Sequence, residues 1–286
     1  MIVSLKLIVV WIALLAGGVL GGVLLPFSIP GEGDGPFTAE QAFLLVNFLH
    51  AIVLTALASQ AAWQGSALGL TVAVVFLFAQ SLLLLVEALW FNAYLEAPVG
   101  ALLRAAGHTA FQAALAGSVT ALLWRRRQAR ASSQVHLNRL PVAAALYVLC
   151  YFAGGTLIAL SSPWLRDYYN VADDRSSEIA LVPLLAFQYA RGIVWAGLAY
   201  VLARMLGGAA WSRGVLAGLT FGILASASLF YPTAFMPWSV RGVHIVEVLA
   251  SNTLFGWGAV LIFMGGQAQR PSKDDPTVEG FVSSLS

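Results

Sequence analysis

Long apolar runs recur along the chain, each about the same length, and short polar stretches separate them. A transmembrane helix needs roughly 20 consecutive, mostly apolar residues to cross the hydrocarbon core of a bilayer. The pattern therefore predicts an all-α membrane protein with about eight transmembrane helices. Their expected ranges are 4–25, 41–62, 66–91, 104–124, 140–160, 180–206, 213–231 and 240–264.

Composition agrees with this pattern, because 59% of the 286 residues are hydrophobic and only 10% are charged. A soluble domain needs roughly 25% charged residues to cover its surface, so the expected solvent and partner is membrane lipid. The net charge of +2 does not indicate nucleic acid, because basic residues in membrane proteins report topology. The single cysteine, Cys150, excludes an internal disulfide and offers no zinc pattern.

The distribution of charge over the loops predicts the orientation of the chain. The basic loop WRRRQAR and Arg139 lie between the fourth and fifth segments, whereas Glu32, Asp34 and Asp167 lie in the opposite loops. Basic loops stay on the cytoplasmic side of a membrane. We therefore expect a multi-pass protein of the bacterial inner (plasma) membrane with both termini in the cytoplasm.

The two halves of the chain resemble each other, which indicates an internal duplication. WIALLAGGVLGGVLLPFSIP matches LYVLCYFAGGTLIALSSPWL, VNFLHAIVLTALA matches AFQYARGIVWAGLA, and GHTAFQAAL matches VHIVEVLAS. An even number of helices per unit gives both units the same orientation. The aligned polar pairs are Asn47 with Gln188, His50 with Arg191, and His108 with His244.

The expected organisation is therefore two tandem four-helix bundles. Residues 1–125 form the first transmembrane unit, 126–139 a basic cytoplasmic linker, 140–266 the second transmembrane unit and 267–286 a cytoplasmic tail. Bundles of this kind place their sites in the core between facing helices.

The stretch FLLVNFLHAIVLTALASQ (43–60) carries Asn47 and His50 inside an apolar segment. Ionisable residues inside membrane segments are expensive and mark function by default. His50 lies about nine residues from the outer end of its helix, or roughly 14 Å at 1.5 Å per residue, and His108 lies about one turn into the fourth segment. We expect both imidazoles to face one cavity, where they would be the two metal ligands, binding a haem iron axially.

Other polar residues suit the same cofactor. Asn47 or Gln112 could hold the second ring nitrogen of a histidine indirectly, through water or a neighbouring helix, and Arg191 or Arg104 could pair with haem propionates. The alternative is that each histidine bonds a neighbouring helix as part of ordinary packing.

Two acidic residues, Glu87 and Glu247, also lie in apolar segments. They are expected either to handle protons or to pair with Arg104 or Arg241. Motifs for other chemistry are missing: the sequence has no GxSxG, HExxH or Walker loop, and no lysine for a retinal Schiff base in the second to eighth segments.

The eight predicted helices in two fused units, with histidines in the second and fourth, resemble the haem A synthase family. FLHAIVLTALA is similar to the family's E-x-x-H-R helix, with His50 as the histidine, and VGALLRAAGHTAFQAALAGSVTALLW with His108 is similar to its fourth helix. QYARGIVWAGLA resembles the Q-x-x-H-R helix of the second unit, and His244 falls at the position of the family's final histidine.

Three departures change what the resemblance implies. Asn47 stands at the position of the catalytic glutamate, Ala51 replaces the following arginine, and Arg191 replaces the histidine that would bind a second haem with His244. The resemblance thus implies a relative that binds one haem b, or none, and leaves enzymatic activity undecided.

The leading hypothesis is an integral membrane protein that binds haem b through His50 and His108, with Asn47, Arg191 and His244 as further cofactor-binding candidates. It would serve electron transfer or haem handling, as a possible subunit of a respiratory complex. The alternative is a cofactor-free membrane subunit or assembly factor that binds quinone, lipid or partner helices. A small transporter is a third hypothesis, but the broken helices expected of one are missing.

Overall fold

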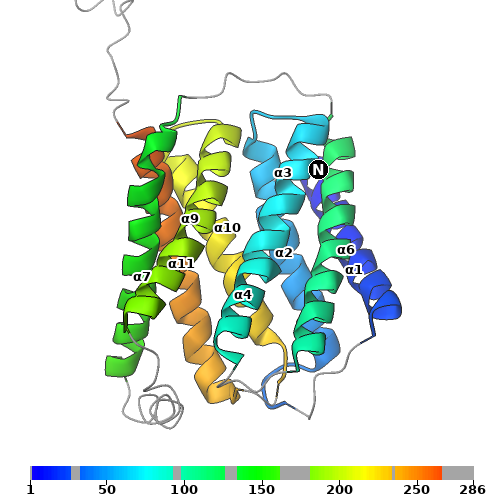
Figure 1. Ribbon diagram of the computed structural model, residues 1–286. Helices are drawn as coiled ribbons and strands as arrows, with labels where there is room; N and C mark the ends of the chain where they lie inside the picture. Colours follow the sequence, from blue (N-terminus) through cyan, green and yellow to red (C-terminus); the bar gives the residue numbers. More distant parts are fainter. Residues whose placement is uncertain are drawn as a thin grey trace, which may run out of the picture.

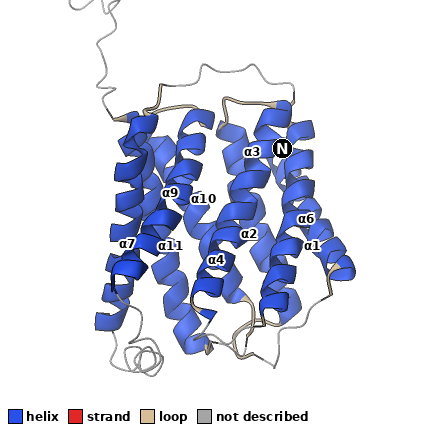
Figure 2. Cartoon of the chain, in the orientation of Figure 1, coloured by secondary structure: helices blue, strands red, loops and turns tan. Residues whose placement is uncertain are grey.

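The structure is a computed structural model that describes residues 2–26, 33–92, 98–125, 134–161, 181–233 and 236–265. Within these ranges the chain is helical and contains no β-strand, as Figure 2 shows. Most of the basic linker, the acidic loop with Asp167 and the predicted tail at 267–286 lie outside the described residues.

In the described part of the chain, eight long helical segments run side by side, alternately up and down (Figure 1). Each coincides with a predicted segment to within a few residues. The elements are α1 (Ile2–Leu24), α2 (Ala39–Gln60), α3 (Gly65–Leu77), α4 (Leu83–Trp90), α6 (Val99–Leu123), α7 (Leu140–Ser161), α9 (Leu181–Met205), α10 (Ala210–Ser226) and α11 (Trp238–Met264). A π-helical turn, Phe78–Leu82, joins α3 to α4, and 3-10 turns occur at Leu137–Arg139 and Ala227–Phe230.

Among the described residues, seven helical segments are long and apolar enough to cross a membrane, which indicates a multi-pass membrane protein. They are Val3–Leu24, Ala39–Gln60, Gly65–Trp90, Leu137–Ile158, Leu181–Met205, Ala210–Phe230 and Trp238–Met264. The predicted eighth segment, α6, is long enough at 25 residues. It is less apolar because Arg104, His108 and Gln112 interrupt its hydrophobic sequence.

Contacts between helices fall into two sets. In the first, α1 packs on α2 and α6, and α3 packs on α6; in the second, α7 packs on α9 and α11, and α10 packs on α11. Figure 1 shows the two sets next to each other. They meet where α2 contacts α10 and α3 contacts α9. A pair of backbone hydrogen bonds also joins the ends of α2 and α9, from Ala62 N to Met205 O (2.7 Å) and from Gly207 N to Gln60 O (2.8 Å).

Close contacts at glycine bring the backbones together in both sets. A Cβ atom at Gly69 in α3 would collide with the backbone of Gly117 in α6, and one at Gly218 in α10 would collide with the backbone of Thr253 in α11. Small residues at helix contacts allow this approach in membrane proteins. Gly117 and Thr253 are 136 positions apart, which is also the separation between His108 and His244.

The contact at Gly218 predicts that a substitution there lowers thermal stability more than a substitution of a glycine outside the helix contacts. Gly218→Val should overpack the α10–α11 contact by about 1–3 kcal/mol, which lowers the midpoint of thermal unfolding by roughly 3–10 °C. Gly197→Val in α9 is the matched control, because a Cβ atom there meets nothing within 4 Å. Equal midpoints for the two purified variants would contradict the close approach of α10 and α11.

Candidate functional site

A cavity of about 560 Å³ lies between α2, α4, α6 and the connection from α10 to α11. Its volume falls in the range of roughly 300–1,000 Å³ typical of ligand and cofactor sites. Apolar residues make up part of its wall. The polar side chains on the wall are Asn47, Gln80, His50, Ser81, His108, Thr109, Gln112, Ser228, Tyr231, Thr233 and Arg241.

The imidazole of His50 is buried in this wall with an exposed fraction of 2%. Neither ring nitrogen has a hydrogen-bond partner among the described residues. The ring contacts Phe76 edge-on, with the ring centroids 5.2 Å apart. Because a buried polar group without a partner costs about 1–3 kcal/mol, His50 is expensive to keep at this position for packing alone.

His108 lies on the same cavity wall, but its ring is already oriented. Its Nε2 atom lies 2.8 Å from the carbonyl oxygen of Leu25, just after the end of α1. A carbonyl only accepts hydrogen bonds, so Nε2 carries the proton and donates it. Gly21 makes the approach possible, because a Cβ atom there would lie 2.9 Å from His108 Cα. The two histidines thus lie on the wall of one cavity and come from different helices.

Two side-chain amides link α2 to α6 beside the cavity. Gln112 donates from Nε2 to Asn47 Oδ1 (2.7 Å), while Asn47 donates from Nδ2 to the carbonyl oxygen of Phe43 (2.7 Å). The Asn47 amide thus accepts one hydrogen bond and donates another. Asn47 thus bonds Gln112 and its own helix, and no direct hydrogen bond to the ring of His50 is found among the described residues.

The π-helical turn places a second buried polar group on the wall. Gln80 and Ser81 belong to this turn, and the Oε1 atom of Gln80 is buried with no partner in the described part of the chain. Such turns are frequent at functional sites. Sequence reasoning missed this feature, since nothing in the apolar run around Gln80 distinguishes a π-helical turn from an α-helical one.

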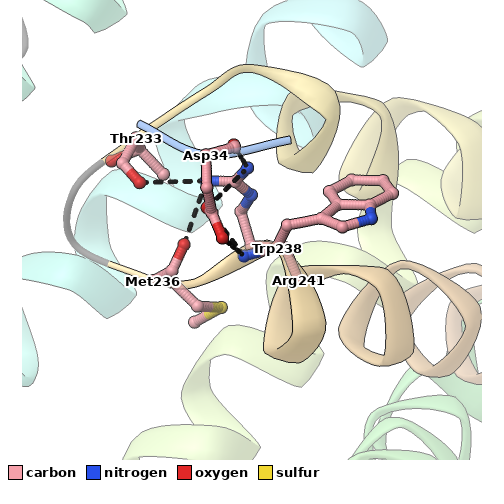
Figure 3. A network of polar contacts seen from close by, with 5 residues as sticks. All are labelled: Asp34, Thr233, Met236, Trp238 and Arg241. Carbon is pink, nitrogen blue, oxygen red and sulfur yellow. Dashed lines mark hydrogen bonds and ion pairs between the residues drawn. The ribbon is translucent and has the colours of Figure 1, made fainter. Parts of the chain in front are cut away.

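Arg241 lines the cavity near the start of α11. Figure 3 shows the network of polar contacts around its guanidinium. Its side chain is 1% exposed and donates to the carbonyl oxygens of Thr233 (3.0 Å), Met236 (2.9 Å) and Asp34. The Asp34 carboxylate lies 3.5 Å from the guanidinium and accepts from the backbone N–H of Trp238 (2.8 Å). One arginine thus ties the connection after α1 to the start of α11.

Arg191 lies outside this cavity, in the contact between the two sets of helices. From α9 its guanidinium donates to Glu87 Oε2 in α4 (2.7 Å) and to the carbonyl oxygen of Leu83 (3.2 Å). The partner of Glu87 is therefore Arg191, rather than Arg104 or Arg241 as expected from the sequence. The rotation of α4 about its axis determines which arginine pairs with Glu87, because it turns the Glu87 side chain toward α9.

His244 also lies apart from the cavity wall. Its Nδ1 atom is 2.6 Å from Glu247 Oε2, one turn along the same helix. Glu247 in turn lines a separate groove between α7 and α11. The structure thus brings together His50, His108 and Asn47, and it leaves Arg191 and His244 in two other networks.

Comparisons with protein-family models, with curated proteins and with solved structures found no match. In the described part of the chain, no group of three or more His, Cys, Asp or Glu side chains is placed to hold a metal ion.

The ion pair between Arg191 and Glu87 predicts strong coupling of two substitutions. Arg191→Met or Glu87→Leu alone should lower the free energy of unfolding by roughly 2–3 kcal/mol, less than for a fully buried pair because Glu87 is 25% exposed. The double variant should lose less than the sum of the two, because neither charge is left unpaired. Denaturant unfolding of the four proteins measures this coupling, and additive losses would show that the two side chains do not interact.

Proposed function

We propose that this chain is a multi-pass membrane protein that binds one haem b in the cavity between α2 and α6, for electron transfer or haem handling. The observation that carries the proposal is the buried imidazole of His50, which has no partner among the described residues and shares a cavity wall with His108. Haem supplies one-electron transfer when it is bound.

The residues of the cavity suit this cofactor. His50 offers an unoccupied ring nitrogen as an axial ligand. The bond from His108 to the Leu25 carbonyl is the kind of second contact that orients a ligating histidine. Arg241 places a cation on the same wall for carboxylate groups of the cofactor, in addition to its ion pair with Asp34. Within this proposal, Arg241 takes the role that the sequence suggested for Arg191.

The wider architecture of the proposal is two tandem four-helix units, 1–125 and 140–266, in a bacterial inner membrane with both termini cytoplasmic. The matching close contacts at Gly69 and Gly218 support the duplication, and the basic loops support the orientation. This arrangement agrees with the resemblance to the haem A synthase family. Asn47 carries an amide in place of a carboxyl group and supplies no acid for oxidative chemistry, so a binding or electron-transfer role is favoured, beside other respiratory membrane subunits.

One observation favours the alternative of a cofactor-free membrane subunit. The ring of His50 packs edge-on against Phe76, and such a contact contributes about 0.5–1.5 kcal/mol between aromatic rings. Under this reading His50 is a packing residue, and its loss would change stability only.

An absorption spectrum of the purified protein distinguishes the two functions. The wild-type protein and the control His136→Ala, whose side chain is exposed, should show a Soret band, because neither loses a proposed ligand. His50→Ala should lose the band, and His108→Ala should shift or weaken it. A wild-type protein with no Soret band and no extractable haem would overturn the proposal.

A further inference from the structure

A second recess, separate from the cavity lined by His50 and His108, lies between α7 and α11. Figure 1 shows these two helices next to each other in green and orange. It is a groove of about 470 Å³. Leu149, Leu157, Val246 and Leu254 line it, and each is 57–68% exposed. The groove is thus an apolar recess on the outside of the helix array, where membrane lipid surrounds a protein of this class.

One carboxylate interrupts this apolar wall. The side chain of Glu247 is 16% exposed, and its Oε2 atom bonds His244 Nδ1 at 2.6 Å. Its Oε1 atom faces α7, because a Cβ atom at Gly154 would lie 3.1 Å from it. No hydrogen bond to Oε1 is found among the described residues. Burying a carboxylate in a membrane helix is costly and marks a functional position by default.

The depth of Glu247 limits what can reach it. Glu247 follows Trp238, the first residue of α11, by nine positions, which is roughly 14 Å along the helix. The polar layer on each side of the hydrocarbon core is only about 5–8 Å thick. The head group of a phospholipid stays in that layer, so a ligand for Glu247 must carry its polar group into the hydrocarbon.

We propose that this groove binds a quinol, a lipid-soluble ring with hydroxyl groups and an isoprenoid tail. A ring hydroxyl donates a hydrogen bond to Glu247 Oε1, while His244 holds the other carboxylate oxygen in place. The hydroxyl of Ser251, one turn further along α11, lines the same groove. The tail lies along the apolar wall formed by α7 and α11. None of these residues lines the cavity that His50 and His108 share, so this inference does not rest on the proposed function.

Two neighbouring glycines in α7 provide a matched test. Gly154 lines the groove, whereas a Cβ atom at Gly155 meets nothing within 4 Å. The probe is decylubiquinol, and its binding to the full chain in phosphatidylcholine nanodiscs is measured by equilibrium dialysis. We expect saturable binding to the wild type and to Gly155→Leu, and binding at least about tenfold weaker for Gly154→Leu.

A second pair of variants covers the case in which Gly154→Leu does not fold. Leu157→Trp fills the groove from its exposed rim, and Leu160→Trp changes an exposed residue that does not line it. Only the first should weaken binding. Glu247→Gln, which keeps the shape of the side chain, should also weaken it, because the charged acceptor is lost.

Three results would overturn the proposal. In the first, the groove-filling variants bind decylubiquinol as well as the wild type does. In the second, the wild type binds no decylubiquinol but retains a phospholipid that Gly154→Leu releases. In the third, Gly154→Leu changes the oligomeric state without changing quinol binding, which would assign the groove to a second copy of the chain.

Discussion

Polar side chains inside the hydrocarbon layer have no water to bond, so each must find its partners within the protein. Some buried polar residues meet this constraint by bonding another helix, whereas others, such as Thr71 and Thr220, bond a carbonyl oxygen of their own helix. Arg191 in α9 pairs with Glu87 in α4, and Gln112 in α6 donates to Asn47 in α2. Such bonds fix the rotation of the helices that carry them. Other buried polar groups have no partner among the described residues, and they include both ring nitrogens of His50 and the Oε1 atom of Gln80.

Glycine contacts let these polar groups meet. Gly21 allows α6 to approach α1 so closely that His108 reaches the carbonyl oxygen of Leu25, at the end of α1. This bond selects the protonated nitrogen of His108 and sets the direction of its ring. The close packing of α1 on α6 at Gly21 thus sets how His108 is presented to the cavity that it shares with His50.

The helices were predictable from the sequence, because the length of an apolar run is a one-dimensional signal. The prediction that His50 and His108 face one cavity came from counting residues along two helices, and both side chains line the same cavity. The partner of Glu87 was not predictable, since it depends on how α4 is rotated relative to α9. The position of Arg241 on the cavity wall depends on its bond to the connection at Asp34, 207 positions earlier in the chain. No local pattern records such a contact. The π-helical turn at Gln80 likewise has no signal in its apolar sequence.

The most direct test of a haem held between His50 and His108 is low-temperature electron paramagnetic resonance of the oxidised, purified protein. Two imidazole ligands from different helices predict a low-spin ferric haem signal. In His108→Ala, with one ligand left, this signal should give way to a high-spin one. A wild-type protein with no ferric haem signal, or with a high-spin signal only, would contradict the assignment of these two histidines as the axial pair.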